Sequence, residues 1–320
     1  CLLAMPFTLI RGLHNLRAQH RGCVATIGSF DGVHRGHRAI LDQLLTQAQA
    51  LNLPSVVMVF EPQPYEFFSG EKAPARLMRL RDKIRVLSAC GVDRVFCLQF
   101  NQRLRQLSAH DFIKQVLVDG LGIKSLVVGD DFRFGCDRTG DFSLLEKAGQ
   151  EYGFSVYDTC TLQDGGERIS STRIRLALEA ENFAEAERLL GHAYTMQGRV
   201  VYGQQLGRTI GVPTANVRLH RYRSPLNGVF AVRLRIVGTA EWLLGVANVG
   251  VRPTVGGETR PILEVHLLDF EGHLYSSEVE VLFDKKLRDE QKFPSFDALK
   301  EQIYRDITQA RTFFGKTGND

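Results

Sequence analysis

A short segment with two histidines carries the strongest chemical signal in the chain. His34 and His37 belong to Gly28-Ser-Phe-Asp-Gly-Val-His-Arg-Gly-His37, which follows an apolar run and precedes a helical pattern. A strand-to-helix turn directs free backbone N–H groups and the positive end of the helix at any anion bound there. Gly32 and Gly36 permit tight turns and close approach of the backbone. The segment therefore predicts a phosphate-binding site in which two imidazoles donate hydrogen bonds.

The same segment favours transfer of an AMP group over other nucleotide chemistry. Such a transfer needs in-line positioning and hydrogen-bond donors where negative charge grows on the α-phosphate and the leaving pyrophosphate. The segment contains neither Gly-x-Gly-x-x-Gly nor Gly-x-x-x-x-Gly-Lys-Ser/Thr. It therefore counts against a dinucleotide oxidoreductase and against a P-loop kinase.

A second hydroxyl-rich segment, Ile169-Ser-Ser-Thr-Arg-Ile-Arg175, opens another predicted helix. The hydroxyls of Ser170, Ser171 and Thr172 either cap that helix or form a further anion site. Arg175 lies one turn into the helix and can hold two phosphate oxygens at once. The two interpretations are equally supported for this segment alone, and its pairing with the histidine segment favours the anion site.

A glycine-rich arch lies in the second half of the chain, from Gly203 to Asn216. Gly203 and Gly207 are one residue too close for a Walker motif, and Arg208 takes the place of its lysine. Such an arch can still surround phosphates with its backbone amides. Thr214 and Asn216 are two residues apart and face the same way in an extended chain. Their neutral oxygens suit Mg²⁺ shared with the phosphates of ATP.

Glu264 supplies the base that a kinase at this arch needs. It shares a face of a predicted strand with Ile262, His266, Leu268 and Phe270. A carboxylate on a mostly apolar face is costly unless it is paired or functional. It is either an edge-strand residue in a salt bridge or a general base that accepts the proton of a primary hydroxyl attacking the γ-phosphate.

The elements that position the histidine segment alternate between strand and helix. Helical patterns are predicted at about residues 37–51, 76–89, 108–120 and 173–190. Short apolar runs, typical of buried strands, occur at Val24–Gly28, Ser55–Phe60, Val95–Leu98, Ser125–Gly129 and Ser155–Tyr157. The alternation predicts an α/β fold, a Rossmann-like domain with a parallel sheet and helices on both faces.

The second half instead shows apolar residues with a period of two, separated by Gly- and Pro-bearing turns. The segments are Arg199–Tyr202, Val229–Ile236, Trp242–Ala247, Ile262–Leu268 and Glu278–Phe283. This pattern predicts an antiparallel barrel or sandwich, and a helix at about 296–313 ends it. We expect the domain boundary near residues 185–195, giving domains 1–187 and 188–320.

Composition sets broader limits. The 320 residues are enough for two domains, 44% of them are apolar, and the net charge is +4 without a long basic run. We expect an enzyme with anionic small-molecule substrates that binds no nucleic acid. The chain has no apolar window long enough to span a membrane and no signal-peptide pattern, and its six cysteines are scattered. It is therefore expected to be soluble and cytoplasmic, with reduced thiols. It is expected to be a monomer or a weak homo-oligomer.

The two motifs of the first half resemble those of the nucleotidyltransferase superfamily, in which His-x-Gly-His and Ile-Ser-Ser-Thr-x-x-Arg bind ATP phosphates. Phe60-Glu-Pro-Gln-Pro64 and Gly129-Asp-Asp-Phe-Arg-Phe-Gly135 narrow the resemblance to an FMN adenylyltransferase. The resemblance implies catalytic roles for His34, His37 and Arg175. The nucleotide and flavin contacts that it implies are Gly28, Phe30, Asp31, Gly32, Gly36, Ser170, Ser171, Thr172, Phe60, Pro62, Pro64, Asp130, Asp131 and Phe132.

The second half is similar to the riboflavin kinase family, whose fold is a six-stranded antiparallel barrel. The matching stretches are the arch ending in Pro-Thr-Ala-Asn216, Pro225–Phe230, Gly245–Thr254, Leu263–Leu267 and Leu287–Phe293. The resemblance implies that Thr214 and Asn216 bind Mg²⁺ and that Glu264 is the catalytic base, assisted by Arg208. The ligand contacts that it implies are Gly203, Gly207, Gly211, Pro213, Asn248, Arg252, Arg288 and Glu290.

The order of the two halves resembles the prokaryotic bifunctional FAD synthetases, from about residue 9 to about 315. That resemblance implies phosphorylation of riboflavin to FMN and adenylylation of FMN to FAD, each with ATP and Mg²⁺. Three positions depart from the family pattern: Ser29, Val212 and Phe230 stand where Asn, Phe and Tyr are frequent. We expect Val212 and Phe230 to loosen the kinase pocket without removing a catalytic atom.

Three other interpretations compete with this one. One of the two activities is lost and its domain is a scaffold; or the barrel senses FMN as a regulatory module; or the first half adenylylates another phosphate ester. The joint presence of a base, a metal pair and a phosphate clamp disfavours the sensor, because binding alone needs none of them. The Gly129–Gly135 stretch and the attached barrel disfavour the other substrate.

Overall fold

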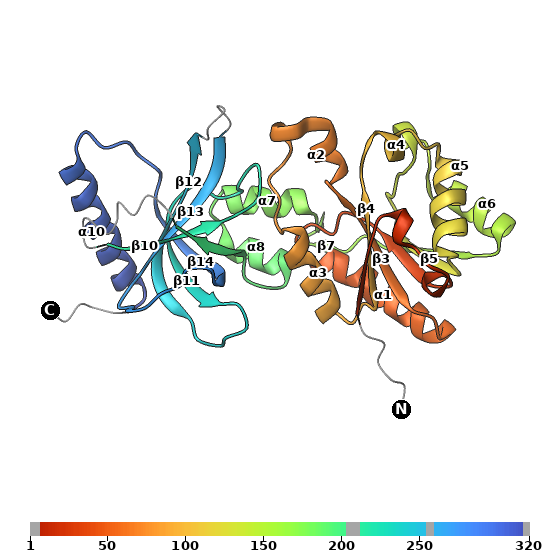
Figure 1. Cartoon of the computed structure of the whole chain (residues 1–320), viewed down its shortest axis with the longest axis horizontal. Coiled ribbons are helices and arrows are strands. Elements are labelled where there is room, and N and C mark those ends of the chain that lie inside the picture. The colour runs from red at the N-terminus through yellow and green to blue at the C-terminus, as the bar shows by residue number, and fades with distance from the viewer. Residues whose placement is uncertain (1–6, 203–211, 254–258, 316–320) are drawn as a thin grey trace. The chain divides into compact units, whose positions relative to one another are not determined.

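The computed structural model describes residues 7–202, 212–253 and 259–315 and consists of two compact units (Figure 1). The first unit comprises residues 1–74 and 80–171, and the second comprises residues 75–79 and 172–320. Each unit has its own sheet and its own core, which agrees with two different domains.

The first unit is built on a six-stranded sheet with the order β1-β4-β3-β2-β5-β6, and every neighbouring pair is parallel. The strands are β1 (Thr8–Arg11), β2 (Val24–Ile27), β3 (Ser55–Glu61), β4 (Arg94–Gln99), β5 (Ser125–Gly129) and β6 (Ser155–Thr159). The β3 residues Val56 to Val59 are all fully buried. Strands covered on both faces need such continuous apolar runs, which is why the runs of β2, β3, β4 and β5 were recognisable in the sequence.

Helices cover both faces of this sheet (Figure 1). They are α1 (Arg35–Leu51), α2 (Pro64–Ser69), α3 (Leu80–Ala89), α4 (Gln102–Arg105), α5 (Ala109–Phe112) and α6 (Phe142–Tyr152), with short 3-10 turns at Leu13–Asn15, Ala18–His20, Gly70–Lys72 and Cys136–Arg138. The helix expected at 108–120 is only partly α-helical, because Ile113–Leu121 is a π-helix. A small hairpin of β7 (Gln163–Asp164) and β8 (Glu167–Arg168) precedes the second unit.

The second unit contains a closed antiparallel barrel with the order β10-β13-β12-β11-β14-β9. Its strands are β9 (Thr195–Val201), β10 (Thr214–Arg218), β11 (Gly228–Ile236), β12 (Leu243–Pro253), β13 (Thr259–Leu267) and β14 (Glu278–Arg288). The predicted fold class is therefore confirmed for both halves. Closure of the barrel removes exposed sheet edges.

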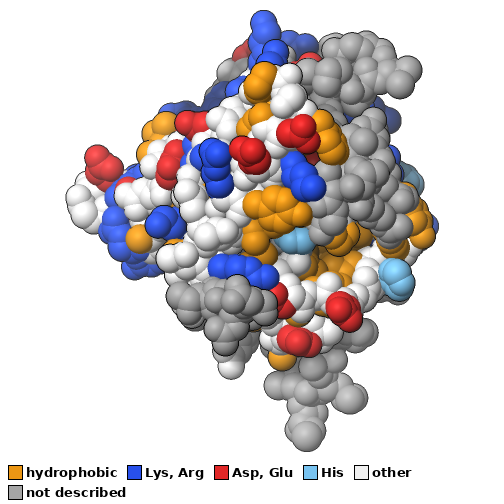
Figure 2. Space-filling model, turned by 90° about the vertical axis from the view of Figure 1, so that its left-hand side faces the viewer, with side chains coloured by type: hydrophobic (Ala, Val, Ile, Leu, Met, Phe, Trp, Pro, Cys, Tyr) orange, Lys and Arg blue, Asp and Glu red, His pale blue; other side chains and the backbone are white. Residues whose placement is uncertain are grey.

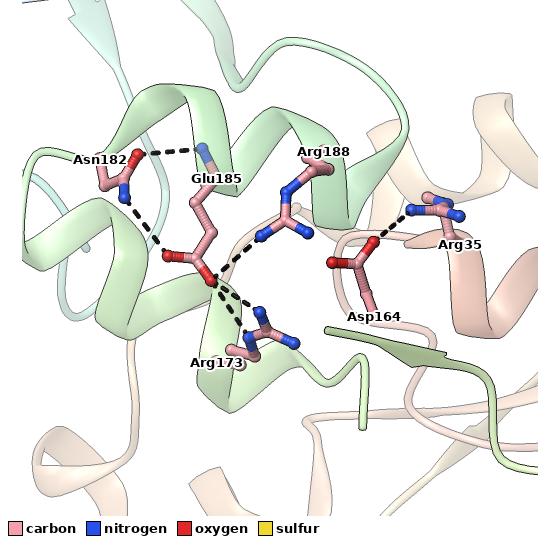
Figure 3. Close-up of polar contacts among 6 residues, drawn as sticks. All are labelled: Arg35, Asp164, Arg173, Asn182, Glu185 and Arg188. Atoms are coloured by element: carbon pink, nitrogen blue, oxygen red, sulfur yellow. Dashed lines mark hydrogen bonds and ion pairs between the residues drawn. The ribbon is translucent and has the colours of Figure 1, made fainter. Parts of the chain in front are cut away.

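The helix expected at 173–190 is two helices, α7 (Ser171–Glu179) and α8 (Phe183–Leu190). Glu181 has a left-handed φ of 62°, and Asn182 caps α8 by accepting a hydrogen bond from the Glu185 amide at 3.0 Å. The Glu185 carboxylate also binds Arg173 of α7 at 2.8 Å (Figure 3). The corner between α7 and α8 is thus capped and held by an ion pair, which an apolar period alone does not show.

The last helix, α10 (Phe296–Phe313), has the predicted bounds and packs on the outside of the barrel. Its cap is Ser295, whose hydroxyl accepts a hydrogen bond from the Ala298 amide at 3.1 Å. An apolar cluster joins the helix to the barrel wall through Ala310, Val229, Ala231, Val246 and Leu268. Some outward-facing barrel residues are therefore buried, so both sides of these strands have packing partners.

Candidate active sites

The histidine segment lies at the topological switch point of the parallel sheet. The chain runs from β2 through β3 to β4 on one side, and β5 pairs with β2 on the other. Loops that leave the carboxyl ends of β2 and β5 diverge, and open α/β sheets bind ligands in the crevice between such loops. The β2–α1 loop, residues 28–34, leaves β2 at this point and leads directly into α1.

His34 caps α1, and His37 stacks on it. The His34 Nδ1 atom accepts a hydrogen bond from the His37 amide at 3.3 Å, and the two ring centroids are 3.6 Å apart. Burial, together with the charges of His34, Lys83 and Arg168, holds the pKa of His37 well below its ordinary value of 6.5. His37 is therefore neutral at pH 7. Its Nδ1 atom is buried and has no partner among the described groups.

The serine segment meets this loop. The Ser171 hydroxyl donates a hydrogen bond to the Asp31 carbonyl at 2.9 Å. A Cβ atom at Gly36 would lie 3.4 Å from the Ile169 carbonyl and 3.2 Å from the His34 ring, so this position favours glycine. The structure thus brings the two predicted motifs of the first unit together.

Thr172 and Arg175 belong to the second unit. Thr172 is exposed, whereas Arg175 is buried and its Nε donates to the Ala75 carbonyl at 2.6 Å. The predicted phosphate clamp by Arg175 stays a prediction, because this hydrogen bond lies within the second unit.

The first-unit hairpin is also tied to the helix that follows the loop. Arg35, which lies between His34 and Gly36, binds Asp164 of β7 at 2.9 Å (Figure 3). Arg168 of β8 forms a bidentate ion pair with Asp131, which lowers the pKa of that carboxyl through the hydrogen bonds and charge of the guanidinium. The paired carboxylates of the Gly129–Gly135 stretch are thus engaged, since Asp130 accepts from the Thr161 hydroxyl at 2.8 Å.

Aromatic rings gather at the carboxyl ends of β3, β4 and β5. Phe60 meets Phe100 edge to face at 5.8 Å, and Phe67 of α2 meets the same ring at 5.3 Å. Phe132 and Phe134 stack at 5.5 Å after β5. Pro62 lies between Phe60 and α2, Pro64 is the first residue of α2, and both prolines are partly exposed. The predicted flavin stretches therefore present apolar faces on the same edge of the sheet as the β2–α1 loop.

The barrel register assembles the predicted kinase residues. Asn216 of β10 and Asn248 of β12 both pair with Glu264 of β13, one on each side. Thr214 pairs with His266, one step along the same face. Directly opposed Cβ atoms in antiparallel strands are about 5 Å apart. The carboxylate of Glu264 therefore stands between two carboxamides, with the Thr214 hydroxyl on the adjacent diagonal.

Glu264, Asn248 and Thr214 form part of the wall of a cavity of about 390 Å³ between the barrel and the C-terminal segment, whereas Asn216 does not line it. The lining includes five predicted residues: Thr214, Asn248, Glu264, Arg288 and Glu290. Apolar side chains of α10 and the segment before it form the opposite wall, among them Phe293, Phe296, Leu299, Ile303 and Ile307. Figure 2 faces this end of the unit and shows hydrophobic and histidine side chains in a hollow with charged residues around it. Such a site suits a flat apolar ring with a few polar groups.

Arg288 is held by the C-terminal helix. Its Nη2 and Nε atoms bind the Asp306 carboxylate at 2.8 and 2.9 Å, and Gln302 donates to the same carboxylate at 2.9 Å. Asp306 is 2% exposed. The guanidinium also lies over the Phe293 ring, 5.6 Å from its centroid. Arg288 thus links β14, α10 and the cavity wall.

The structure places Val212 and Phe230, whereas several other predicted residues lie outside the part of the chain that it describes. Val212 lines the cavity, whereas Phe230 lies in the barrel core against Phe283 at 5.4 Å and does not line the cavity. Phe230 is therefore a core residue, and the expectation that it loosens the kinase pocket is not supported by a place in the cavity wall. Outside the described residues are Gly203, Gly207, Arg208, Gly211 and the Arg252 side chain.

Three residues near the sites were not predicted. Lys83 of α3 is 1% exposed and donates from Nζ to the Ser29 carbonyl. His266 lines the kinase cavity, binds the Pro213 carbonyl at 2.9 Å, and has a pKa lowered by burial. Asp306 anchors Arg288. The signal for His266 was present, since it shares the face of Glu264, but a lysine or an aspartate in an amphipathic helix resembles a surface residue.

The fold and the two sites define a two-domain, nucleotide-dependent transferase. The family models of FAD synthetase and riboflavin kinase match residues 16–173 and 190–314. The bifunctional riboflavin kinase/FMN adenylyltransferase of Escherichia coli K12 is 56% identical over 97% of this chain and 98% of its own. The chain belongs to the bifunctional riboflavin kinase/FMN adenylyltransferase family, which confirms the predicted family and the prediction of two activities.

Two further similarities extend over nearly the full length of the chain. The enzyme of the same name from Pseudomonas fluorescens is 56% identical over 95% of this chain and 96% of its own. A crystal structure of a macrolide-efflux protein from Streptococcus pneumoniae is 29% identical, with a TM-score of 0.77 over 95% of this chain and 99% of that one. Among the residues that the structure describes, every helix is too short or too polar to cross a membrane.

Proposed function

We propose that the barrel cavity phosphorylates riboflavin with Glu264 as the base, and that the β2–α1 loop supports adenylylation of the resulting FMN. The observation that carries the residue assignment is the row Asn216–Glu264–Asn248 across three barrel strands, with Glu264 and Asn248 in the cavity wall.

In the kinase reaction, the primary hydroxyl of riboflavin attacks the γ-phosphorus of ATP. An oxygen–phosphorus bond forms, the bond to the bridging oxygen breaks, and ADP leaves. Glu264 accepts the hydroxyl proton, because a carboxylate in hydrogen-bond reach of the nucleophile acts as a general base. The apolar wall from α10 excludes water and holds the ring, which favours in-line attack over hydrolysis.

The donor set on β10 fits a magnesium ion. The Thr214 hydroxyl and the Asn216 amide supply hard, neutral oxygens, and the Glu264 carboxylate is the direct cross-strand neighbour of Asn216. Magnesium is usually held by few protein oxygens together with substrate phosphates. When bound, it neutralises charge on the transferring phosphate. Full rates of either reaction in excess chelator would contradict this proposal.

In the adenylyl transfer, a phosphate oxygen of FMN attacks the α-phosphorus of ATP, and pyrophosphate leaves. No proton has to move, so the protein contributes positioning and hydrogen-bond donors. The N-terminal end of α1 and the imidazole N–H groups of His34 and His37 serve as these donors. Arg175 is proposed as the clamp on the phosphate oxygens. The flavin is proposed to lie on the aromatic and proline faces after β3 and β5.

The experiment is incubation of the purified chain with riboflavin, ATP and Mg²⁺, with flavins separated by chromatography over time. FMN should appear first and FAD later. Glu264→Ala should abolish FMN formation and leave FAD formation from supplied FMN largely intact. His37→Ala combined with Arg175→Ala should do the reverse. Loss of both activities from a folded chain with either change would contradict the two-site proposal.

We further propose domain limits of 1–187 and 188–320, since the two family matches leave residues 174–189 between them. We also propose that the enzyme works in the cytoplasm on small molecules alone, as a monomer or weak homo-oligomer. The five described cysteines are all free thiols, which fits a reducing compartment. Size-exclusion chromatography with light scattering tests the oligomeric state.

A further inference from the structure

The β2–α1 loop has a strained backbone, in which the Val33 amide donates a hydrogen bond to the Phe30 carbonyl at 3.3 Å. Phe30 and Val33 have left-handed φ values of 47° and 42°, and Gly32 between them has a φ of 83°. A left-handed conformation is unfavourable for most residues and especially for a β-branched one such as Val33. Such strain persists only where surrounding contacts over-determine the backbone.

Two side chains from other elements provide these contacts, and both bind carbonyl groups. Ser171 donates to the Asp31 carbonyl at 2.9 Å, and Lys83 donates from Nζ to the Ser29 carbonyl. Ser171 and Lys83 thus both bind carbonyl oxygens of the loop and leave its amide N–H groups unbound by them. The Phe30 and Gly32 amides donate to no group within the described parts of the chain, although both residues are buried. Buried amides without a partner are rare and point to a ligand.

Lys83 is an unusual residue for such an anchor. It is 1% exposed, and lysines are almost never so buried unless paired or functional. Its long side chain carries the Nζ donor from α3 to the Ser29 carbonyl of the loop.

We propose that Lys83 is a positioning residue of the adenylyl-transfer site. Its buried ammonium group fixes the Ser29 carbonyl, keeps the loop in its left-handed conformation, and so presents the Phe30 and Gly32 amides to the phosphates of ATP. The inference rests on the proposed role of this loop in adenylyl transfer. Lys83 acts through the loop and makes no contact of its own with the reacting atoms.

The test compares Lys83→Met and Lys83→Gln with a matched control, Lys114→Met. Lys114 is an exposed lysine of the same unit whose Nζ binds Asp119 at 2.6 Å. In FMN adenylylation, Lys83→Met should raise the KM for ATP by roughly 10-fold or more, the scale of one charged hydrogen bond. Lys83→Gln keeps a donor for the carbonyl and should recover most of that loss. Lys114→Met should match the unaltered chain.

Riboflavin phosphorylation reports on the second unit alone, so urea unfolding of each variant, followed by circular dichroism, reports whether the first unit, which holds Lys83, is folded. A folded Lys83→Met whose KM for ATP and kcat in adenylylation stay within about twofold of the unaltered chain would overturn the inference, and so would equal losses in Lys83→Met and Lys83→Gln. His37→Ala, assayed in parallel, distinguishes a failure of the proposed adenylyl-transfer site from a failure of the positioning role of Lys83. If His37→Ala keeps full adenylylation, the proposed site itself is wrong; if only the Lys83 variants do, the positioning role is wrong.

Hydrogen exchange on the unaltered chain keeps the inference testable should Lys83→Met fail to fold. A non-hydrolysable ATP analogue should slow exchange of the Phe30 and Gly32 amides by about tenfold or more, since bound donors are protected from solvent. Unchanged exchange at both amides under saturating analogue would overturn the inference.

Discussion

At the scale of single residues, the stacked histidines depend on staying neutral. Two imidazolium rings with centroids 3.6 Å apart would repel each other strongly. Burial lowers the pKa of His37, and the charges of Lys83 and Arg168 act in the same direction. The neutral form keeps one N–H donor and one acceptor on each ring. The pair can thus bind phosphate oxygens while the acceptor of His34 caps α1.

This leads to a pH-dependent stability. Unfolded His37 binds a proton below about pH 6.5, but the folded residue does not, so falling pH favours the unfolded state. The contribution of His37 to the free energy of unfolding is fully present above about pH 6.5 and is lost as the pH falls below it. Each pH unit costs up to about 1.4 kcal/mol for this one group. His37→Gln should therefore lose less stability than the unaltered chain between pH 7.5 and 5.5 in urea unfolding. Parallel pH profiles for the two proteins would contradict the assignment.

The residues that sequence reasoning found are those in unusual chemical settings. Glu264 was detectable because it shares a mostly apolar face of its predicted strand, and His34 and His37 because of their short spacing after a strand. Lys83 and Asp306 were not, because charged residues are common on amphipathic helices and only the tertiary structure buries these two. Sequence periodicity identifies a buried face but not a buried ion partner on its border.

At the scale of elements, α10 completes the kinase cavity, and the Arg288–Asp306 pair holds it. The Arg288 and Asp306 side chains are 20% and 3% exposed. Removing one partner from a buried pair leaves an unpaired charge and typically costs about 3–5 kcal/mol.

Asp306→Ala should therefore loosen α10, raise the KM for riboflavin, and lower the unfolding midpoint, while FAD formation from FMN stays unchanged. Glu301→Ala is the matched control, because it removes an exposed ion pair of the same helix, with Arg305 at 3.3 Å. That change should cost at most about 0.5 kcal/mol. Equal effects of the two changes on riboflavin KM would refute the anchoring role.

Helices and strands were predictable where the spacing of apolar residues fits only one type of secondary structure. The four internal strands of the parallel sheet, its edge strand β6 and five barrel strands matched predicted runs. Burial on one or both faces fixes the composition of the internal and barrel strands. The edge strand β1 and the strand β10 were not predicted, since Thr8–Arg11 is short and Thr214–Arg218 carries the polar residues of the site. The π-helix at Ile113–Leu121 preserves the apolar spacing of an α-helix closely enough to be missed.

At the scale of the whole molecule, the two proposed catalytic sets belong to units with separate cores. Glu264 and its neighbours lie within the second unit, and His34, His37 and Ser171 lie within the first. An intermediate made in one unit and used in the other does not require both sites to be on the same chain. FMN released into solution can enter the adenylyl-transfer site of any chain.

An equimolar mixture of Glu264→Ala and His37→Ala chains should therefore convert riboflavin to FAD, although neither variant alone does so. The His37→Ala chain makes FMN, which must accumulate before the Glu264→Ala chain uses it, so FAD should appear after a lag that shortens as protein concentration rises. Chromatography of flavins over time measures both features, and FMN added at the start should remove the lag. A mixture that makes FMN but no FAD, while Glu264→Ala still adenylylates supplied FMN at high concentration, would mean that FMN passes between sites within a single chain.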